Sequence, residues 1–542
     1  MSPFETQSEE LEPLLEEVLQ ETDPGAIGVA LQRLAKASEG RQVEFLVALA
    51  AAEQRLATID PAVTATLIRI LHTLALSNRD ELERRLDLPR ISTLLECIPV
   101  NCPNRHLLLQ LLAMLGSQGA IEMLVQELIV APPAGGEAKA WMDAALVLSP
   151  LMQSSQWPVG AFFPKVLAAM EHVALAAPIL DVGNHLVRSG RVNLHPASDR
   201  KAFLFELLGG VVSRLARFEE DPRSFGDDVQ TVQEKLSESV VLAVCLCDAV
   251  ALIGDDSVAG KLHQALELKH RRVQCEAAGS LAKLGHSEGG ERLVELAAEP
   301  SARLRAIAYA DELGLGEKID ASFREPNAIA ESEMALWMSQ PGQMGVPPTA
   351  VEVIDSRRML WPSFEDPIDV YLVRYEYNFG DRTYSNVGVT GPVNFSLGAD
   401  VADLPMDDIY AVYAGWHAEH DEIFSVDAKE LNDAQARIMS AFADHLSRSD
   451  WDSLQPELFC VFLDEHAGVF TATRDGLEVR VITDGLETIE QPVGGRMRPL
   501  NATDVFHLYK GRKMLRTFNP GMDDELNEGD DRIADPPHGE SL

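Results

Sequence analysis

The segments LAVCLCDAVALIG (242–254), VQCEAAGSLAKLG (273–285) and LRAIAYADELGLG (304–316) decide the fold of the first part of the chain. Their first residues are 31 positions apart, and each segment is an Ala-rich apolar pattern that ends on glycine. Glycine is favoured after a helix because it accepts the left-handed backbone conformation without a steric penalty. We therefore expect helix C-caps at three positions, Gly254, Gly285 and Gly316.

Two of these segments are followed by shorter helical patterns, KLHQALELKH (261–270) and GERLVELAAE (290–299). A fixed period near thirty residues with two helices in each unit is typical of a stacked helical solenoid. Small residues such as Ala277, Ala278 and Ala306 let neighbouring helices approach closely. The sequence therefore predicts an α-solenoid.

The phrases EAAGSLAKLGHSEGGERLVELA (276–297) and SARLRAIAYADELG (301–314) resemble the HEAT-repeat family, in particular its short bacterial phycobilisome-lyase-type repeat. The resemblance is clearest over residues 231–316, and residues 105–128 resemble the repeat more weakly. The acidic residue and Val-Arg pair that the family places before the first helix of a unit survive only loosely, in residues 270–273. The resemblance implies adaptor or scaffold roles, and similar repeats handle bilin chromophores on proteins.

Composition changes along the chain, because seven of the eight tyrosines lie between Tyr371 and Tyr509. Strong helix formers dominate the first part, whereas Tyr and β-branched residues favour strands in the second. The predicted regions are an irregular helical-repeat region (1–218), a polar loop (219–230), HEAT-like repeats (231–320), a linker (321–348), an α+β domain (349–518) and an acidic disordered tail (519–542).

The α+β prediction depends on strand-like runs that flank two helical stretches. Runs at 350–355, 368–379 and 383–391 precede helices expected near 406–420 and 428–447. Three more runs follow, LFCVFLD, GVFTATRD and LEVRVIT, with a tight hairpin turn at Asp475-Gly476. This order is typical of helices packed on one antiparallel sheet. The expected fold is an α-solenoid followed by an α+β domain with an antiparallel sheet.

The charge balance limits the partners that we expect. Asp and Glu number 85 against 46 Lys and Arg, and the formal charge is -39. Such a field repels phosphate backbones and anionic membrane surfaces, so we expect neither general nucleic-acid binding nor membrane insertion. No run approaches the length of apolar residues that spans a bilayer. Solubility alone is a sufficient reason for the acidity.

The six cysteines form no CxxC pair of the kind that zinc or redox sites use. Most lie in apolar helical patterns and are interpreted as small buried hydrophobes in a reducing compartment. The acidic N-terminus lacks a secretory signal pattern. We therefore expect a cytoplasmic protein and predict no cofactor.

His417 and His420 are the sharpest local candidates for chemistry. Histidines three apart on a helix share a face, and both could reach one metal ion. The alternative is a solvated helix end, where groups that can carry positive charge are favoured by the helix dipole.

A glycine-containing stretch at 378–395 is the second candidate. Gly380-Asp381 predicts a hairpin turn, and glycines in a strand can let a ligand approach the backbone. The alternative is that the charged and aromatic residues are cross-strand pairs on a sheet face. The candidate ligand-binding residues are Arg374, Arg382, Tyr384, Gly388 and Gly391.

A basic strip concentrates positive charge near the end of the α+β region. It could bind an acidic partner or nucleic acid, but internal pairing with the acidic tail from Asp523 or with the acidic solenoid is the simpler explanation. Its members are Arg496, Arg498, Lys510, Arg512, Lys513 and Arg516.

Two functional hypotheses follow. The first is a protein–protein interaction scaffold or adaptor, because stacked repeats expose a long surface and no nucleophile or dinucleotide motif is found. The alternative is a ligand-binding or enzymatic α+β domain, including a lyase-like or chaperone-like variant, with the solenoid selecting a protein substrate. Missing local motifs favour a protein without catalytic activity, although catalytic groups meet in space rather than in sequence.

Overall fold

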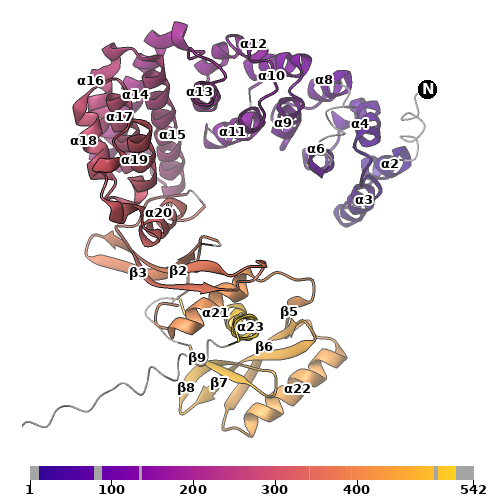
Figure 1. The fold of residues 1–542 in the computed structure, drawn as a ribbon. Coiled ribbons are helices and arrows are strands. Elements are labelled where there is room, and N and C mark those ends of the chain that lie inside the picture. Colours follow the sequence, from indigo (N-terminus) through magenta and orange to yellow (C-terminus); the bar gives the residue numbers. More distant parts are fainter. Residues whose placement is uncertain are drawn as a thin grey trace, which may run out of the picture. The chain divides into compact units, whose positions relative to one another are not determined.

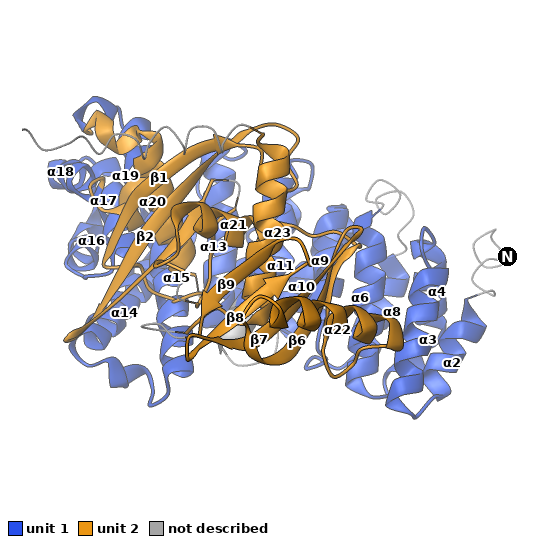
Figure 2. Ribbon diagram, turned by 90° about the horizontal axis from the view of Figure 1, so that it is seen from below, with its two compact units in different colours: residues 1–296, 305–318 blue, residues 297–304, 319–542 orange. Residues whose placement is uncertain are grey.

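The structure is a computed structural model that divides into two compact units (Figures 1 and 2). Unit 1 comprises residues 1–296 and 305–318, and unit 2 comprises residues 297–304 and 319–542. The residues described are 11–77, 88–132, 137–340, 342–391, 393–399, 401–493 and 498–520, without the side chains of 137–141 and 379. The predicted acidic tail lies outside them from residue 521 onwards.

Unit 1 is helical throughout its described residues. Its first helices are α2 (Glu12–Gln20), α3 (Pro24–Ala37), α4 (Gln42–Ala51), α5 (Glu53–Leu56), α6 (Pro61–Ser77), α8 (Leu88–Cys97), α9 (Arg105–Leu115), α10 (Gln118–Val130), α11 (Glu137–Gln153) and α12 (Val159–Phe162). The later ones are α13 (Val173–Arg188), α14 (Lys201–Glu220), α15 (Val229–Ile253), α16 (Ala259–Leu266), α17 (Arg271–Lys283) and α18 (Ser287–Leu296), with short 3-10 helices η1 (Lys165–Glu171), η2 (Ser198–Arg200), η3 (Pro222–Phe225), η4 (Asp256–Val258) and η5 (Gly316–Lys318). Helix α19 (Pro300–Glu312) is divided, because its residues 300–304 belong to unit 2 and its residues 305–312 to unit 1.

Local sequence sets several of these helix boundaries. Asp23 begins α3 by accepting a hydrogen bond from the Ala26 N–H at 2.8 Å, and Ser117 and Asp228 cap α10 and α15 in the same way. Gly116 ends α9 in the left-handed conformation. The helix ends therefore follow from capping residues that the sequence displays.

Most helices of unit 1 from α9 to α18 pack in two layers. The first layer is α9, α11, α13, α15 and α17, each of which contacts the next. The second layer includes α10, α14, α16 and α18, each packed against its sequence neighbour in the first layer. From α9 and α10 to α16 and α17, Leu, Ala and Val side chains fill the space between the layers and form one continuous core. Figure 1 shows both layers.

Hydrogen bonds fix neighbouring helices of the first layer against each other. The Asn184 side chain on α13 donates to the Cys245 carbonyl of α15 at 3.1 Å. From the other side, the Ser280 hydroxyl of α17 donates to the Cys247 carbonyl at 2.8 Å. Because these groups are buried, a slip of either helix along α15 would leave them unpaired.

Unit 2 contains two antiparallel sheets. The first has the order β1 (Ala350–Met359), β2 (Ile368–Phe379), β3 (Arg382–Thr390) and β4 (Phe395–Ser396). The second has the order β5 (Ile423–Asp427), β6 (Asp452–Phe462), β7 (Glu465–Arg474), β8 (Leu477–Thr483) and β9 (Thr488–Pro492). Its helices are η6 (Ala321–Arg324), α20 (Pro326–Met338), α21 (Met406–His417), α22 (Asp433–Ser447) and α23 (Ala502–Phe518).

The elements of unit 2 stack in five layers (Figure 1). Helices α21 and α23 pack between the sheets, where Val370 and Val387 of one sheet and Val469 and Ile482 of the other share their core. Helix α20 covers the far face of the first sheet, and α22 covers the far face of the second. Alternating side chains of each strand therefore serve two different cores.

Two expectations differ from this architecture. The expected single sheet is two sheets, because alternation shows that a strand has two faces but not which strands pair. The stretch 321–348, expected as a linker, contains α20, whose Met334 and Met338 are buried against the first sheet. The helical first part and the α+β second part agree with the structure.

All six cysteines are free thiols. Cys97 is partly buried, and the other five are buried. Burial raises the pKa of the thiols, most strongly at Cys245.

Candidate interaction surface

The two candidate metal ligands do not share a helical face. Helix α21 ends at His417, so His420 lies beyond the helix and is exposed. The Trp361 indole N–H donates to His417 Nδ1 at 2.9 Å, and burial lowers the pKa of His417. His420 Nδ1 accepts from the Glu422 N–H at 3.3 Å. Among the described residues, no group of three or more His, Cys, Asp or Glu side chains is placed to hold a metal ion.

The candidate ligand-binding residues are divided between the two faces of the first sheet. Tyr384 lies opposite Tyr377 and packs towards α20. Arg374 lies opposite Val387 on the other face and pairs with the exposed Glu352 carboxylate at 3.8 Å. Since directly opposite residues share a face, Arg374 and Tyr384 cannot line one groove.

Protein atoms fill the space beside the two glycines. A Cβ on Gly388 would lie 2.7 Å from the Met334 Cε of α20, and a Cβ on Gly391 would overlap the Asp369 carbonyl oxygen. Gly391 also has a φ of +116°, which favours glycine. Arg382 is exposed where β3 starts, directly after the turn that Gly380-Asp381 predicted. Close internal packing is therefore the reason for these glycines.

The C-cap predictions hold at the first two glycines. Gly254 has a φ of +77° and Gly285 a φ of +97°. Gly316 instead begins the 3-10 helix η5, and Gly314 has the left-handed φ of +70° after α19. Helix α17 begins at Arg271 and α19 at Pro300, so the structural spacing here is 29 residues. The 31-residue alignment was therefore two residues out of register at its third segment.

The basic strip lies largely on α23 and is paired inside unit 2. Arg512 binds Asp408 at 2.6 Å, and Lys513 binds Asp484 at 2.6 Å. Arg498 and Arg516 also pair with carboxylates of this unit, and Arg496 lies outside the described residues. Internal pairing was expected, but these partners are neither the tail nor the helical region.

A polar cluster joins four helices of unit 1. Arg188 of α13 donates to Asp248 of α15 at 2.9 Å and to the Tyr309 hydroxyl of α19 at 3.3 Å. Tyr309 donates in turn to Glu276 of α17 at 2.6 Å, and Arg305 donates to the same carboxylate at 2.8 Å. Burial, followed by the Glu276 carboxylate, raises the pKa of Tyr309, so the phenol stays a neutral donor.

This cluster was not predicted, because its members lie far apart in sequence. Glu312 extends it by binding Arg188 at 3.1 Å and Lys283 at 2.5 Å. Charge-assisted hydrogen bonds of this kind fix geometry as well as adding stability. The cluster holds the C-terminal ends of α13 and α19 in a set position relative to α15 and α17.

A similar side-chain contact recurs three times along the chain. Near the start of α9, Arg105 donates to the Leu95 carbonyl of the preceding helix at 3.2 Å and binds Glu127 of the following helix at 2.7 Å. Near the start of α17, Gln274 donates to the Leu266 carbonyl at 3.2 Å and accepts from Arg292 of α18 at 3.3 Å.

The third instance is Arg303 near the start of α19. It donates to the Ala297 carbonyl just after α18 at 3.0 Å and binds Glu331 of α20 at 2.9 Å. In each case one side chain satisfies a carbonyl at or near the preceding helix end and pairs with the following helix. The same kind of contact is therefore present near the start of three helices, α9, α17 and α19.

The first layer exposes apolar side chains on α11. Met142 is 46% exposed and Leu146, one turn later, is 50% exposed.

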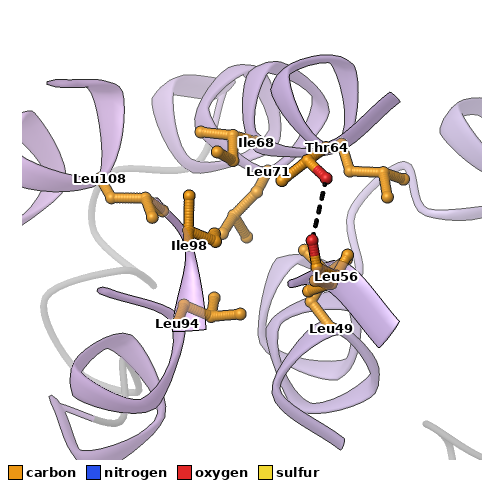
Figure 3. Close-up of a pocket in the computed structure, with 9 residues that line it drawn as sticks. Leu49, Leu56, Thr64, Ile68, Leu71, Leu94, Ile98 and Leu108 are labelled. Carbon is orange, nitrogen blue, oxygen red and sulfur yellow. Dashed lines mark hydrogen bonds between the residues drawn. The ribbon is translucent and has the colours of Figure 1, made fainter. Parts of the chain in front are cut away.

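An apolar cavity of about 10 Å³ lies between α4, α5, α6, α8 and α9 (Figure 3). At its edge the Thr64 hydroxyl donates to the Leu56 carbonyl at 3.3 Å. Its volume is at most that of one water molecule, so it is a packing gap and not a ligand site.

Helix α15 is long and apolar enough to cross a membrane, the one such helix among the described residues. However, 72% of its most apolar stretch is buried inside the protein. The central helix of a folded core has the same composition.

The fold and the surface together define a two-part protein, a layered helical unit followed by an α+β unit. No family model, no curated protein and no solved structure matches this chain.

Proposed function

We propose that this chain is a protein–protein interaction scaffold or adaptor, whose helical part is a HEAT-like solenoid that binds a protein partner on its first layer. The recurring contact made by Arg105, Gln274 and Arg303 carries the proposal, because the same arrangement appears near the start of three different helices. Stacked units of this kind present a continuous surface that is suited to a protein segment.

The exposed apolar residues of α11 support a site on this layer. Met142 and Leu146 project from one face of α11, whose neighbour α13 is held against α15 by a buried hydrogen bond. Apolar side chains exposed together on a rigid surface favour contact with a partner. Under this proposal the α+β unit is a second binding module or an effector.

We do not advance the alternative of a ligand-binding or enzymatic α+β unit. Its candidate ligands His417 and His420 do not share a helical face, and its candidate groove residues Arg374 and Tyr384 lie on opposite faces of a sheet. The function that the geometry supports best is therefore protein binding.

Affinity capture with the full-length chain tests the proposal. Met142→Glu with Leu146→Glu places two charges on the exposed face of α11. Val130→Glu, at a residue of α10 that is 68% exposed, is the matched control. We expect a defined partner to be recovered with the wild type and the control and lost with the α11 variant. Recovery that is equal for all three, or no better than with a charge-matched bait, would refute the proposed surface.

A further inference from the structure

Two histidine–carboxylate pairs join neighbouring parts of the second layer of unit 1. His263 of α16 places its Nε2 2.5 Å from a carboxylate oxygen of Glu288 in the first turn of α18. His286, just before α18, places its Nε2 2.7 Å from Asp256 of η4. The two imidazole rings meet edge to face with their centroids 5.8 Å apart. Four titratable side chains thus form one cluster.

The hydrogen-bond geometry of His263 requires a particular protonation state. Its Nδ1 lies 2.8 Å from the Ala259 carbonyl oxygen, and its Nε2 faces the Glu288 carboxylate. Both neighbours are acceptors, and a neutral imidazole carries only one N–H. Only the doubly protonated cation satisfies both contacts, so loss of one proton sets a lone pair against an oxygen.

Buried His195 shows the opposite arrangement and serves as an internal comparison. Its Nδ1 accepts the Ala197 backbone N–H at 3.1 Å, and its Nε2 lies 3.1 Å from the Asn184 side-chain oxygen. One nitrogen accepts and the other donates, which is what a neutral ring does. The two histidines therefore differ by geometry in the charge that their sites accept.

We propose that the pairs His263–Glu288 and His286–Asp256 form a pH-sensitive latch between the second-layer helices α16 and α18. Both helices pack against α17, and the latch adds a direct link between them that closes when His263 is protonated. The inference rests on the proposed function only in that it treats these helices as adjacent repeats of the scaffold.

The electrostatic surroundings of His263 agree with this behaviour. The Glu288 hydrogen bond, followed by the Ala259 carbonyl, raises the pKa of His263, and Glu267, directly after α16, adds to the effect. Because the folded pKa is raised, the stabilisation is fully present below the unfolded value of about 6.5 and is lost as the pH rises through the folded pKa. The latch therefore opens as the pH rises above the ordinary pKa of histidine.

The lysine side chains near the latch make other contacts. On α17, Lys283 binds Glu312. On the side of α14, Lys201 binds Asp255, and the Lys261 ammonium group lies against Gly209. These cations do not take part in the latch contacts.

A double-mutant cycle on the full-length chain tests the latch. His263→Gln, Glu288→Gln and the double variant are compared by urea denaturation at about pH 5.5 and about pH 8.5, on either side of an ordinary histidine pKa. We expect coupling between the two residues at the lower pH and its loss at the higher pH. All of the substituted side chains are at least 40% exposed, so the variants keep the fold.

The pair Arg292–Glu295 on α18 is the matched control, because it is an ion pair of the same helix that contains no histidine. Its coupling should not change. Hydrogen exchange of α18 amides, compared between the wild type and His263→Gln at each pH, should show faster exchange in the variant only at the lower pH. Coupling or exchange differences that are the same at both pH values would overturn the latch. No partner is used, so this result is independent of the proposed function.

Discussion

Replacing Gly279 with alanine tests the packing between α17 and α19. A Cβ at this position would lie 2.7 Å from three carbon atoms of the Tyr309 ring, whereas ordinary contacts begin at 3.4 Å. The ring would have to move by about 0.7 Å. It cannot do so freely, because the Tyr309 hydroxyl donates to the buried Glu276 carboxylate at 2.6 Å.

The expected effect is the balance of opposing contributions. Alanine is favoured over glycine inside a helix by about 1 kcal/mol. Overpacking costs about 1–3 kcal/mol, and a weakened hydrogen bond to a buried carboxylate costs a further 1–3 kcal/mol or so. We therefore expect Gly279→Ala to lower the free energy of unfolding of unit 1 by about 1–5 kcal/mol.

Urea denaturation followed by far-ultraviolet circular dichroism measures this change. Gly210→Ala is the control, because Gly210 lies within α14 and a Cβ there would meet nothing within 4 Å. The same substitution should stabilise the chain at that position by about 0.5–1 kcal/mol. Adding Tyr309→Leu to Gly279→Ala should recover part of the loss caused by the clash. If Gly279→Ala stabilised the chain as Gly210→Ala does, the packing argument would be refuted.

Three further predictions concern other buried positions. Gly511→Ala should destabilise unit 2 by about 3 kcal/mol or more, since its Cβ would overlap the Ala411 carbonyl oxygen where α23 crosses α21. Gly398→Ala is the control in the same denaturation assay and should have little effect, because a Cβ there would meet open space. Burial lowers the pKa of Lys510 to about 8, so Lys510→Met should stabilise the chain by about 1–3 kcal/mol at pH 7 and lose this advantage by about pH 10, as urea midpoints across that range would show. Burial lowers the pKa of His195 to about 4, so stability should fall by at most about 3 kcal/mol as the pH drops from 6.5 towards 4, and a His195→Gln variant with an equally steep fall would contradict this assignment.

Local patterns predicted local structure well. The hairpin at Gly380-Asp381 and the C-caps at Gly254 and Gly285 follow from backbone preferences that act within a few residues. The C-cap prediction at Gly316 was wrong, because Gly314 and Gly316 both fit the sequence pattern and the spacing between the helices is not constant. Sequence periodicity alone could not choose between them.

Helix α23 was not predicted, because its sequence lacks a continuous apolar stripe. Its buried face carries His507 and Lys510 beside Val505 and Leu508, so the apolar stripe is interrupted by groups that are usually exposed. A Lys510 ammonium group inside unit 2 is accommodated only because the Ala418 carbonyl at the end of α21 accepts its hydrogen bond at 3.1 Å. That acceptor is 92 residues away in sequence.

The expected arrangement of the candidate site residues differs from the structure for a related reason. His417 and His420 share a face only if one helix includes both, and α21 ends between them. The polar cluster around Arg188 and Glu276 has no short motif, since it joins helices that meet only in the folded chain. Tertiary contacts decided each of these cases, and no window of sequence contains them.

The buried cysteines can report when each unit of the chain unfolds. A thiol reacts with an alkylating reagent as the thiolate, and burial both raises the thiol pKa and excludes the reagent. Cys245, Cys247 and Cys275 lie in unit 1, and Cys460 lies in unit 2. Pulsed alkylation followed by peptide mass spectrometry would therefore time the exposure of each unit separately, with neither a dye nor an engineered residue.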